Sequence, residues 1–121
     1  MKNEILHRIA QVIYDKKGSN ILGLDVRGVS NLTDYVIIAE GNVDRHVIGM
    51  MHAIVDDLET VGIRPVHIEG AKTGDWVVID FFDVMVHLFM PGLRDKYHLE
   101  ELWKEGEIVD LHINTAKVVN G

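Results

Sequence analysis

The amino-acid sequence predicts a single α/β domain with a mixed β-sheet flanked by helices. Three observations support this fold class. The chain has 121 residues, which is the usual length of one domain. Segments with helical spacing alternate with strand-like segments in the order α-β-β-α-β-β-β-α. The βαβ unit in this order favours parallel strands, whereas the last two strands favour an antiparallel hairpin.

The first third of the chain is expected to form a helix and two strands. Residues 3–17 place apolar side chains on one helical stripe, and Gly18 ends that helix. Residues 20–26 and 34–41 are rich in strand-forming residues, with a turn-rich segment between them. The two strands are therefore expected to be neighbours in the chain without an intervening helix.

A second helix and a third strand follow. Residues 47–61 keep apolar side chains at helical spacing. Asp44 is expected to cap the start of this helix, and Gly62 to end it. Residues 65–70 then form a short strand.

Residues 76–89, WVVIDFFDVMVHLF, are the most apolar run of the chain. The run is too long for one strand and is expected to break at Phe82–Asp83, which gives the two strands of a hairpin. Residues 92–103 are expected to form a last short helix. We therefore predict a main domain over residues 1–103 and a C-terminal tail over residues 104–121, which contains one strand-like patch and is only partly ordered.

Composition limits the possible compartments and chemistries. The chain has no cysteine, which excludes disulfides, thiolate–metal sites and cysteine nucleophiles. Its N-terminus carries charges in every turn and lacks the apolar region of a signal peptide. No segment reaches the roughly 20 apolar residues that a membrane-spanning helix needs. We expect a cytoplasmic protein that does not enter membranes.

The charge balance favours a protein partner over a nucleic acid. The chain has 19 acidic and 12 basic residues, which gives a net charge of −7. Affinity for a phosphate backbone comes mostly from lysine and arginine, so little direct binding to RNA or DNA is expected. A basic protein is the more suitable partner, because complementary charge accelerates encounter and fixes orientation.

The motifs of common catalytic and metal sites are absent from the sequence. Neither serine lies in a G-x-S-x-G turn, and no phosphate-binding glycine motif occurs. His46 and His52 are six residues apart, which places them on different faces of a helix. His67 and Glu69 resemble the H-x-E of zinc deaminases, whose remaining ligands are cysteines. We therefore predict neither a cofactor nor a metal.

The acids within the apolar run are the main candidates for a functional site. Asp80 and Asp83 could be paired carboxylates for acid–base catalysis, but Asp83 has a simpler explanation as a turn residue. Strand alternation sets Trp76, Val78 and Asp80 on one face. A face with a large aromatic residue and an acid is half-exposed or buried against a partner, and tryptophan is enriched at interface anchors. An ordinary core tryptophan remains an alternative for Trp76.

The second half of the run continues the same alternation. Val84, Val86 and Leu88 can share the core face, which leaves Met85, His87 and Phe89 opposite. His87 is interpreted as a strand histidine whose ring bonds to a neighbouring backbone group or carboxylate. The run is therefore interpreted as a docking hairpin in preference to a catalytic centre.

Several stretches together resemble the Iojap-like family, the ribosomal silencing factors. These stretches are NLTDYVIIAEGNVDRHV (31–47), GIRPVHIEG (62–70) and DWVVIDFFDVMVHLFMPGLRDKYHLEELW (75–103). No single motif is decisive, but their joint appearance in order is specific, and the resemblance runs from about residue 3 to residue 103.

The resemblance implies a function without chemistry. Such proteins have a nucleotidyltransferase-like fold that lacks the catalytic carboxylates. They bind the large ribosomal subunit through ribosomal protein fourteen, obstruct joining of the small subunit, lower translation when nutrients are short, and also occur as homodimers. Carried over by position, the partner-binding surface comprises Glu69, Trp76, Asp80, Asp83, His87, Arg94 and Tyr97.

One residue departs from the family pattern, and one alternative function stays open. The family usually has glycine immediately before the aspartate of the hairpin turn, where this chain has Phe82. A phenylalanine forced to positive φ would be strained, so either the turn differs or Phe82 is an added contact. The alternative function is a nucleotidyltransferase-like, nucleotide-binding enzyme. That site needs two or three clustered carboxylates, whereas Asp34 stands alone after Leu32 and Thr33.

Overall fold

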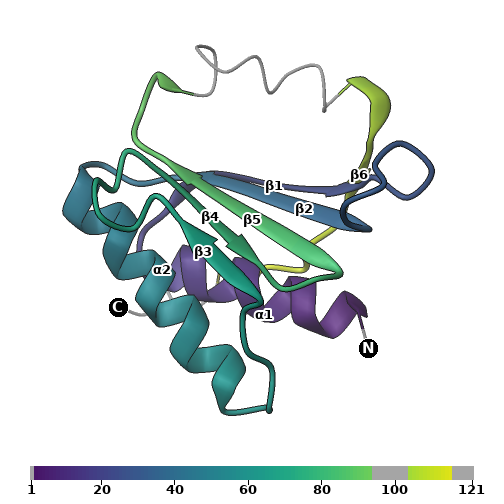
Figure 1. The fold of residues 1–121 in the computed structure, drawn as a ribbon, viewed down its shortest axis with the longest axis horizontal. Helices are drawn as coiled ribbons and strands as arrows, with labels where there is room; N and C mark the ends of the chain where they lie inside the picture. The colour runs from purple at the N-terminus through teal and green to yellow at the C-terminus, as the bar shows by residue number, and fades with distance from the viewer. Residues whose placement is uncertain (1, 94–103, 116–121) are drawn as a thin grey trace.

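The computed structural model describes residues 2–93 and 104–115, shown as the coloured ribbon in Figure 1. Within these ranges the chain contains two helices, α1 (Lys2–Asp15) and α2 (Asp44–Glu59). The strands of the same ranges are β1 (Ser19–Asp25), β2 (Tyr35–Glu40), β3 (His67–Glu69), β4 (Trp76–Asp80), β5 (Val84–Phe89) and β6 (Glu107–Val109). The predicted order is confirmed from α1 to β5, and β6 is the strand-like patch of the C-terminal segment. The helix predicted over residues 92–103 lies outside the described residues from position 94 on.

The strands form one mixed sheet in the order β3-β4-β5-β2-β1-β6. β2 and β5 run parallel, and every other neighbouring pair is antiparallel. α2 connects β2 to β3, and the hairpin of β4 and β5 then fills the space between these two strands. The predicted mixed sheet, with a parallel pair and a final antiparallel hairpin, is therefore confirmed.

Both helices cover the same face of the sheet, which is the lower face in Figure 1. Their apolar stripes pack against alternate strand residues and form the main core, where each buried large apolar side chain contributes roughly 1.5–3 kcal/mol. Arg8 on α1 pairs with Asp57 on α2, with 3.0 Å between Nε and Oδ2. The core residues without exposed surface are Ile9, Ala10, Ile13, Val47, Met50, Ile54 and Leu58 from the helices and Ile37, Ala39, Val77, Ile79, Val86 and Leu88 from the strands.

The start of α2 differs from the prediction by one residue. Val43 occupies the cap position with an extended backbone, φ −143°, and no side-chain cap hydrogen bond. The prediction that Asp44 caps the helix is therefore wrong. Asp44 is the first helical residue, and its Oδ1 accepts a hydrogen bond from the Arg45 amide at 2.7 Å. Its carboxylate still lies near the positive end of the helix dipole, where a negative charge is favourable.

The segment after β6 packs along α1. Leu111 is buried in the main core, and its carbonyl oxygen lies 3.0 Å from Nδ1 of His7. The Gln11 side chain bonds to both backbone groups of Asn114: it donates to the carbonyl at 3.2 Å and accepts from the amide at 2.7 Å. The side-chain amide of Gln11 thus pairs with the Asn114 backbone through one donated and one accepted hydrogen bond, as the backbone of a neighbouring strand does.

Candidate functional site

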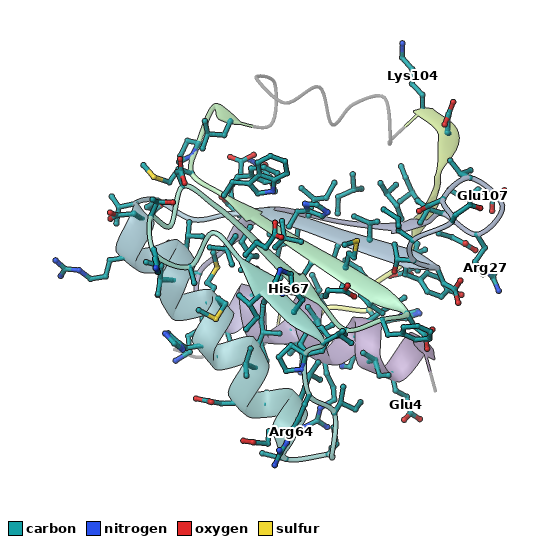
Figure 2. All side chains as sticks on the ribbon, viewed as in Figure 1. Glu4, Arg27, Arg64, His67, Lys104 and Glu107 are labelled. Carbon is teal, nitrogen blue, oxygen red and sulfur yellow. The ribbon has the colours of Figure 1, made fainter. Side chains whose placement is uncertain are left out.

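The face of the sheet opposite α1 and α2 carries most of the residues that the sequence singled out. Neither α1 nor α2 covers this face, and for that reason alone we call it the helix-free face. Paired residues of adjacent strands point to the same side of a sheet, so the register traces rows of side chains across it. The first row contains His67 (labelled in Figure 2), Asp80, Met85, Val36, Leu24 and Ile108. The second row contains Glu69, Val78, His87, Ile38 and Leu22. The third row contains Trp76 and Phe89. Glu69, Trp76, Asp80 and His87 therefore share one face.

Trp76, His87 and Phe89 form an aromatic cluster on the helix-free face. The indole Nε1 of Trp76 donates a hydrogen bond to Nδ1 of His87 at 3.1 Å. The Trp76 ring stacks on Phe89 with 5.3 Å between centroids, and Phe89 is fully buried. A second, smaller core surrounds the cluster and contains Leu24, Val26, Val36 and Ile38. Trp76 itself is only half-buried, so part of its ring remains available to a partner.

His87 is a neutral histidine held by its neighbour. Nδ1 of His87 accepts a hydrogen bond from the indole N–H of Trp76. The single ring proton of neutral His87 therefore lies on Nε2. Burial lowers the pKa of His87 to about 4, since a charged imidazolium would lose its hydration there. The interpretation of His87 as a strand histidine is confirmed, but its partner is the indole of Trp76 and not the backbone group or carboxylate that was expected. Its structural role is to fix the orientation of the Trp76 ring.

Acidification should weaken the fold through His87. The free imidazole has a pKa of 6.5 and the folded one a pKa of about 4, so only the unfolded chain gains this proton between those values. The stabilisation from neutral His87 is complete above pH 6.5 and declines by on the order of 3 kcal/mol as the pH falls to 4. Urea unfolding across this range measures the decline. The variant His87→Gln keeps a hydrogen-bond acceptor without titrating, so its stability should depend less steeply on pH; equal slopes would contradict this account.

Asp80 has a role in the hairpin turn that the sequence reading assigned to Asp83. Oδ1 of Asp80 accepts a hydrogen bond from the Phe82 amide at 2.8 Å. This is the aspartate turn, in which the side chain bonds to the backbone two residues further along. Asp83 contributes its backbone carbonyl, which accepts from the amides of Asp34 at 3.1 Å and Tyr35 at 3.0 Å. The explanation of Asp83 by a side-chain turn bond is therefore corrected, because the carboxylate at the first position of the turn is Asp80.

Phe82 adopts the strained backbone that the sequence comparison anticipated. Its φ is +78°, in the left-handed region that favours glycine. The side chain is 71% exposed, although phenylalanine is among the largest apolar residues of the chain. Strain and exposure thus coincide at the tip of the β4–β5 hairpin.

The remaining predicted residues lie at the edge of the face or outside the described ranges. Glu69 is exposed on the edge strand β3, and its Oε1 lies 2.9 Å from Nε2 of His67. An exposed pair of this kind contributes little stability. Arg94 and Tyr97 lie outside the described residues.

Neither a metal cluster nor a membrane helix occurs in the part of the chain that the structure describes. No group of three or more histidine, aspartate or glutamate side chains there could hold a metal ion. None of its helices is long and apolar enough to cross a bilayer. Asp34 and Asp83 lie close together, but the hydrogen bond between them joins backbone groups.

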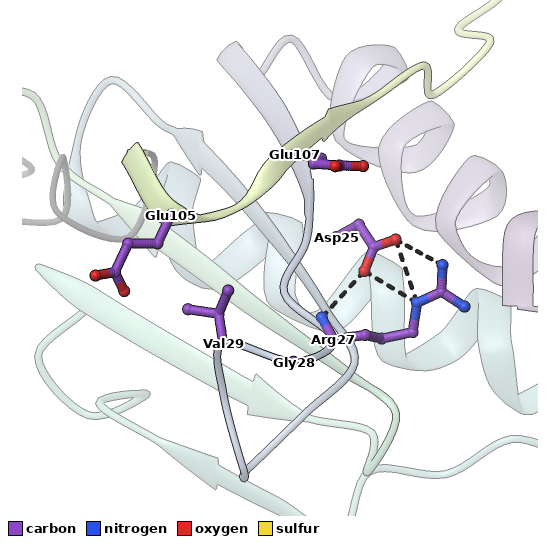
Figure 3. Close-up of a pocket in the computed structure, with 6 residues that line it drawn as sticks. All are labelled: Asp25, Arg27, Gly28, Val29, Glu105 and Glu107. Atoms are coloured by element: carbon purple, nitrogen blue, oxygen red, sulfur yellow. Dashed lines mark hydrogen bonds and ion pairs between the residues drawn. The ribbon is translucent and has the colours of Figure 1, made fainter.

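A shallow pocket of about 650 Å³ lies between the end of β1 and β6 (Figure 3). Asp25 and Arg27 face each other there, with 2.7 Å between Oδ2 and Nη2. The guanidinium lowers the pKa of the Asp25 carboxyl and lies 5.3 Å from the centre of the Tyr35 ring. The sequence reading missed this group, although an acid and an arginine two residues apart beside a turn could have indicated it. Its charges satisfy each other within the chain.

Comparison with known proteins identifies the family. A family model described as "Ribosomal silencing factor during starvation" matches residues 1–120. A Bacillus subtilis protein named Ribosomal silencing factor RsfS is 36% identical over 91% of this chain and 93% of that protein. A mouse protein named "Mitochondrial assembly of ribosomal large subunit protein 1" is 31% identical over 78% of this chain and 43% of that protein.

Solved structures show the same fold. A crystal structure of a protein from Chromobacterium violaceum superposes with a TM-score of 0.80 at 32% identity, covering 94% of each chain. One from Bacillus halodurans gives a TM-score of 0.78 at 32% identity, over 88% of this chain and 97% of the other. The chain therefore belongs to the family of ribosomal silencing factors, ribosome-associated regulators of translation.

Proposed function

We propose that this chain docks on the large ribosomal subunit with its helix-free face and hinders joining of the small subunit, which lowers translation. Membership of the silencing-factor family supports action on the ribosome. The name of the mouse relative refers to the large ribosomal subunit, which supports the choice of subunit. The observation that carries the proposal is a half-buried tryptophan, Trp76, on the face opposite α1 and α2, which also carries Glu69 and Asp80.

The partner on the subunit is a basic protein, and ribosomal protein fourteen is the candidate that the family resemblance suggests. The net charge of −7 opposes direct contact with the ribosomal RNA backbone and favours lysine- and arginine-rich surfaces. Trp76 is the proposed anchor, because tryptophan in a well-packed centre is the commonest type of interface hot spot. Glu69 and Asp80 supply negative charge on the same face, and Asp83 supplies it at the hairpin turn. Arg94 and Tyr97 belong to the proposed surface by resemblance.

The mechanism requires only that the chain occupies its site on the large subunit, and no covalent bond is made or broken. A docked chain occupies the surface that the small subunit must approach, so inhibition follows from steric exclusion. An interface of standard size buries about 800 Å² on each partner, and such interfaces support nanomolar to micromolar affinity. We place this action in the cytoplasm.

Cosedimentation with purified large subunits tests the proposal, and Asp80→Asn tests its electrostatic part. The asparagine side chain keeps the oxygen that accepts the Phe82 amide, so the turn is retained while the charge is lost. We expect affinity to fall about tenfold and to depend less on salt, since a charged pair at an interface is worth roughly 1.5 kcal/mol or more. Asp56→Asn, the same change on an exposed position of α2, is the matched control. Equal affinity of the two variants, or cosedimentation with the small subunit alone, would contradict the proposal.

A further inference from the structure

Three exposed apolar side chains line one end of the sheet. Val66 precedes β3, Phe82 lies in the β4–β5 turn, and Leu32 lies in the loop before β2. Their exposed fractions are 67%, 71% and 79%. The sheet order places β3, β4, β5 and β2 side by side, and all three residues lie at the end where β2, β3 and β5 begin. We call these three residues the apolar rim; at the usual strand spacing it spans roughly 15 Å.

The rim is held by hydrogen bonds centred on the hairpin turn. The Phe82 amide donates to Asp80 Oδ1 at 2.8 Å, and the Val66 amide donates to the Asp80 carbonyl at 2.7 Å. On the other side, the Asp34 amide donates to the Asp83 carbonyl at 3.1 Å. These bonds fix the three supporting loops to one another.

The Leu32 loop has its own anchors. The Leu32 amide donates to Ser30 Oγ at 3.1 Å, and the buried hydroxyl of Thr33 donates to the Tyr35 carbonyl at 3.2 Å. Leu32 is therefore presented to solvent by a braced backbone, and the neighbouring Thr33 points inward.

Phe82 has two energetically unfavourable features in the isolated chain, its backbone conformation and the exposure of its ring. Its backbone is in the left-handed region, which glycine adopts without strain. Its ring is exposed, and a large exposed aromatic side chain beside other apolar residues is typical of an interaction site. Glycine at this position would avoid both features. A contact made by the ring in a complex would offset them.

Charge indicates what kind of partner the rim fits. Asp34, Asp80 and Asp83 flank its three side chains. A second copy of this chain would bring like charges into contact, because each copy carries a net charge of −7. A basic protein segment with an apolar residue between lysines or arginines suits the rim better. Asp80 lies on the helix-free face and also closes the turn, so the rim is continuous with the proposed docking face.

We propose that the apolar rim is a second contact area for the basic protein that the helix-free face engages, with Phe82 as its anchor. This inference rests on the proposed function. The rim receives an apolar side chain of the partner while the flanking aspartates meet adjacent basic groups. It extends the interface beyond the aromatic cluster to the tip of the hairpin and the Leu32 loop.

Two rim variants and one control test the inference by titration against purified large subunits. Phe82→Asn removes the ring but tolerates the left-handed backbone, and Leu32→Ser shortens the second apolar side chain. Each should weaken binding about tenfold, without lowering the melting temperature. Val61→Ser, a half-exposed position in the connection after α2, should bind as the unmodified chain does.

The outcomes separate this inference from the proposed function. If the unmodified chain binds, Trp76→Ala does not, and both rim variants keep full affinity, the rim is no contact and the inference is wrong. If the unmodified chain fails to bind large subunits, the proposed function itself fails. If light scattering shows that the rim variants lose a dimer that the unmodified chain forms, the occupant is a second copy, which also overturns the inference.

Discussion

Gly70→Ala is expected to destabilise the fold by about 4 kcal/mol, among the largest effects that a single added methyl group can produce. Gly70 has φ +82°, and a Cβ atom there would overlap the backbone carbonyl oxygen of Trp76. A backbone atom cannot rotate away as a side chain can. The clash would displace the first residue of β4 and with it the Trp76 ring, so docking should be lost together with stability. Equilibrium unfolding in urea measures the first effect.

Gly62→Ala is the matched control for this prediction. Gly62 has nearly the same backbone angle, φ +81°, but a Cβ atom there would have no neighbour within 4 Å. This variant carries the strain of positive φ alone, about 1–2 kcal/mol. The difference between the two variants isolates the overlap with Trp76. Equal losses would show that the close approach of Gly70 to β4 contributes nothing.

Trp76→Ala is expected to weaken docking on the large subunit by roughly 100-fold, about 3 kcal/mol. The change removes the half-buried ring of the aromatic cluster and takes the hydrogen-bond donor away from His87. Affinity is measured by sedimentation of the variant with large subunits over a range of concentrations.

Trp76→Phe separates the two roles of the tryptophan. This variant keeps an aromatic ring to stack on Phe89 but has no N–H group to orient His87. It should retain more affinity than Trp76→Ala. Circular dichroism of both variants controls for folding. Full affinity of a folded Trp76→Ala would exclude this residue as the anchor.

Local patterns were sufficient to predict the elements and the two faces of the hairpin. Alternation over residues 76–89 correctly placed Val84, Val86 and Leu88 on the core face and Met85 and His87 opposite them. The spacing of apolar residues in helices and their alternation in strands are local properties of the sequence. Both can therefore be recognised without knowing which segments pack together. The break at Phe82–Asp83 followed from the length of the run.

Features that depend on register or on pairing between distant segments could not be predicted. The bond from Trp76 to His87 joins residues on two strands, and it requires the hairpin register. The position of β6 beside β1 depends on a pairing between segments more than 80 residues apart. The turn role of Asp80 depends on which residue begins the tight turn, and the preference of aspartate for turns fits both Asp80 and Asp83.

The most direct test of the account is a subunit-joining assay. Purified large subunits are preincubated with the chain or with Trp76→Ala, small subunits are added, and joined ribosomes are measured by sedimentation. The account predicts that the unmodified chain lowers the yield of joined ribosomes in proportion to its occupancy of the large subunit, and that the variant does so only at about 100-fold higher concentration. Normal joining at full occupancy of the large subunit would contradict it.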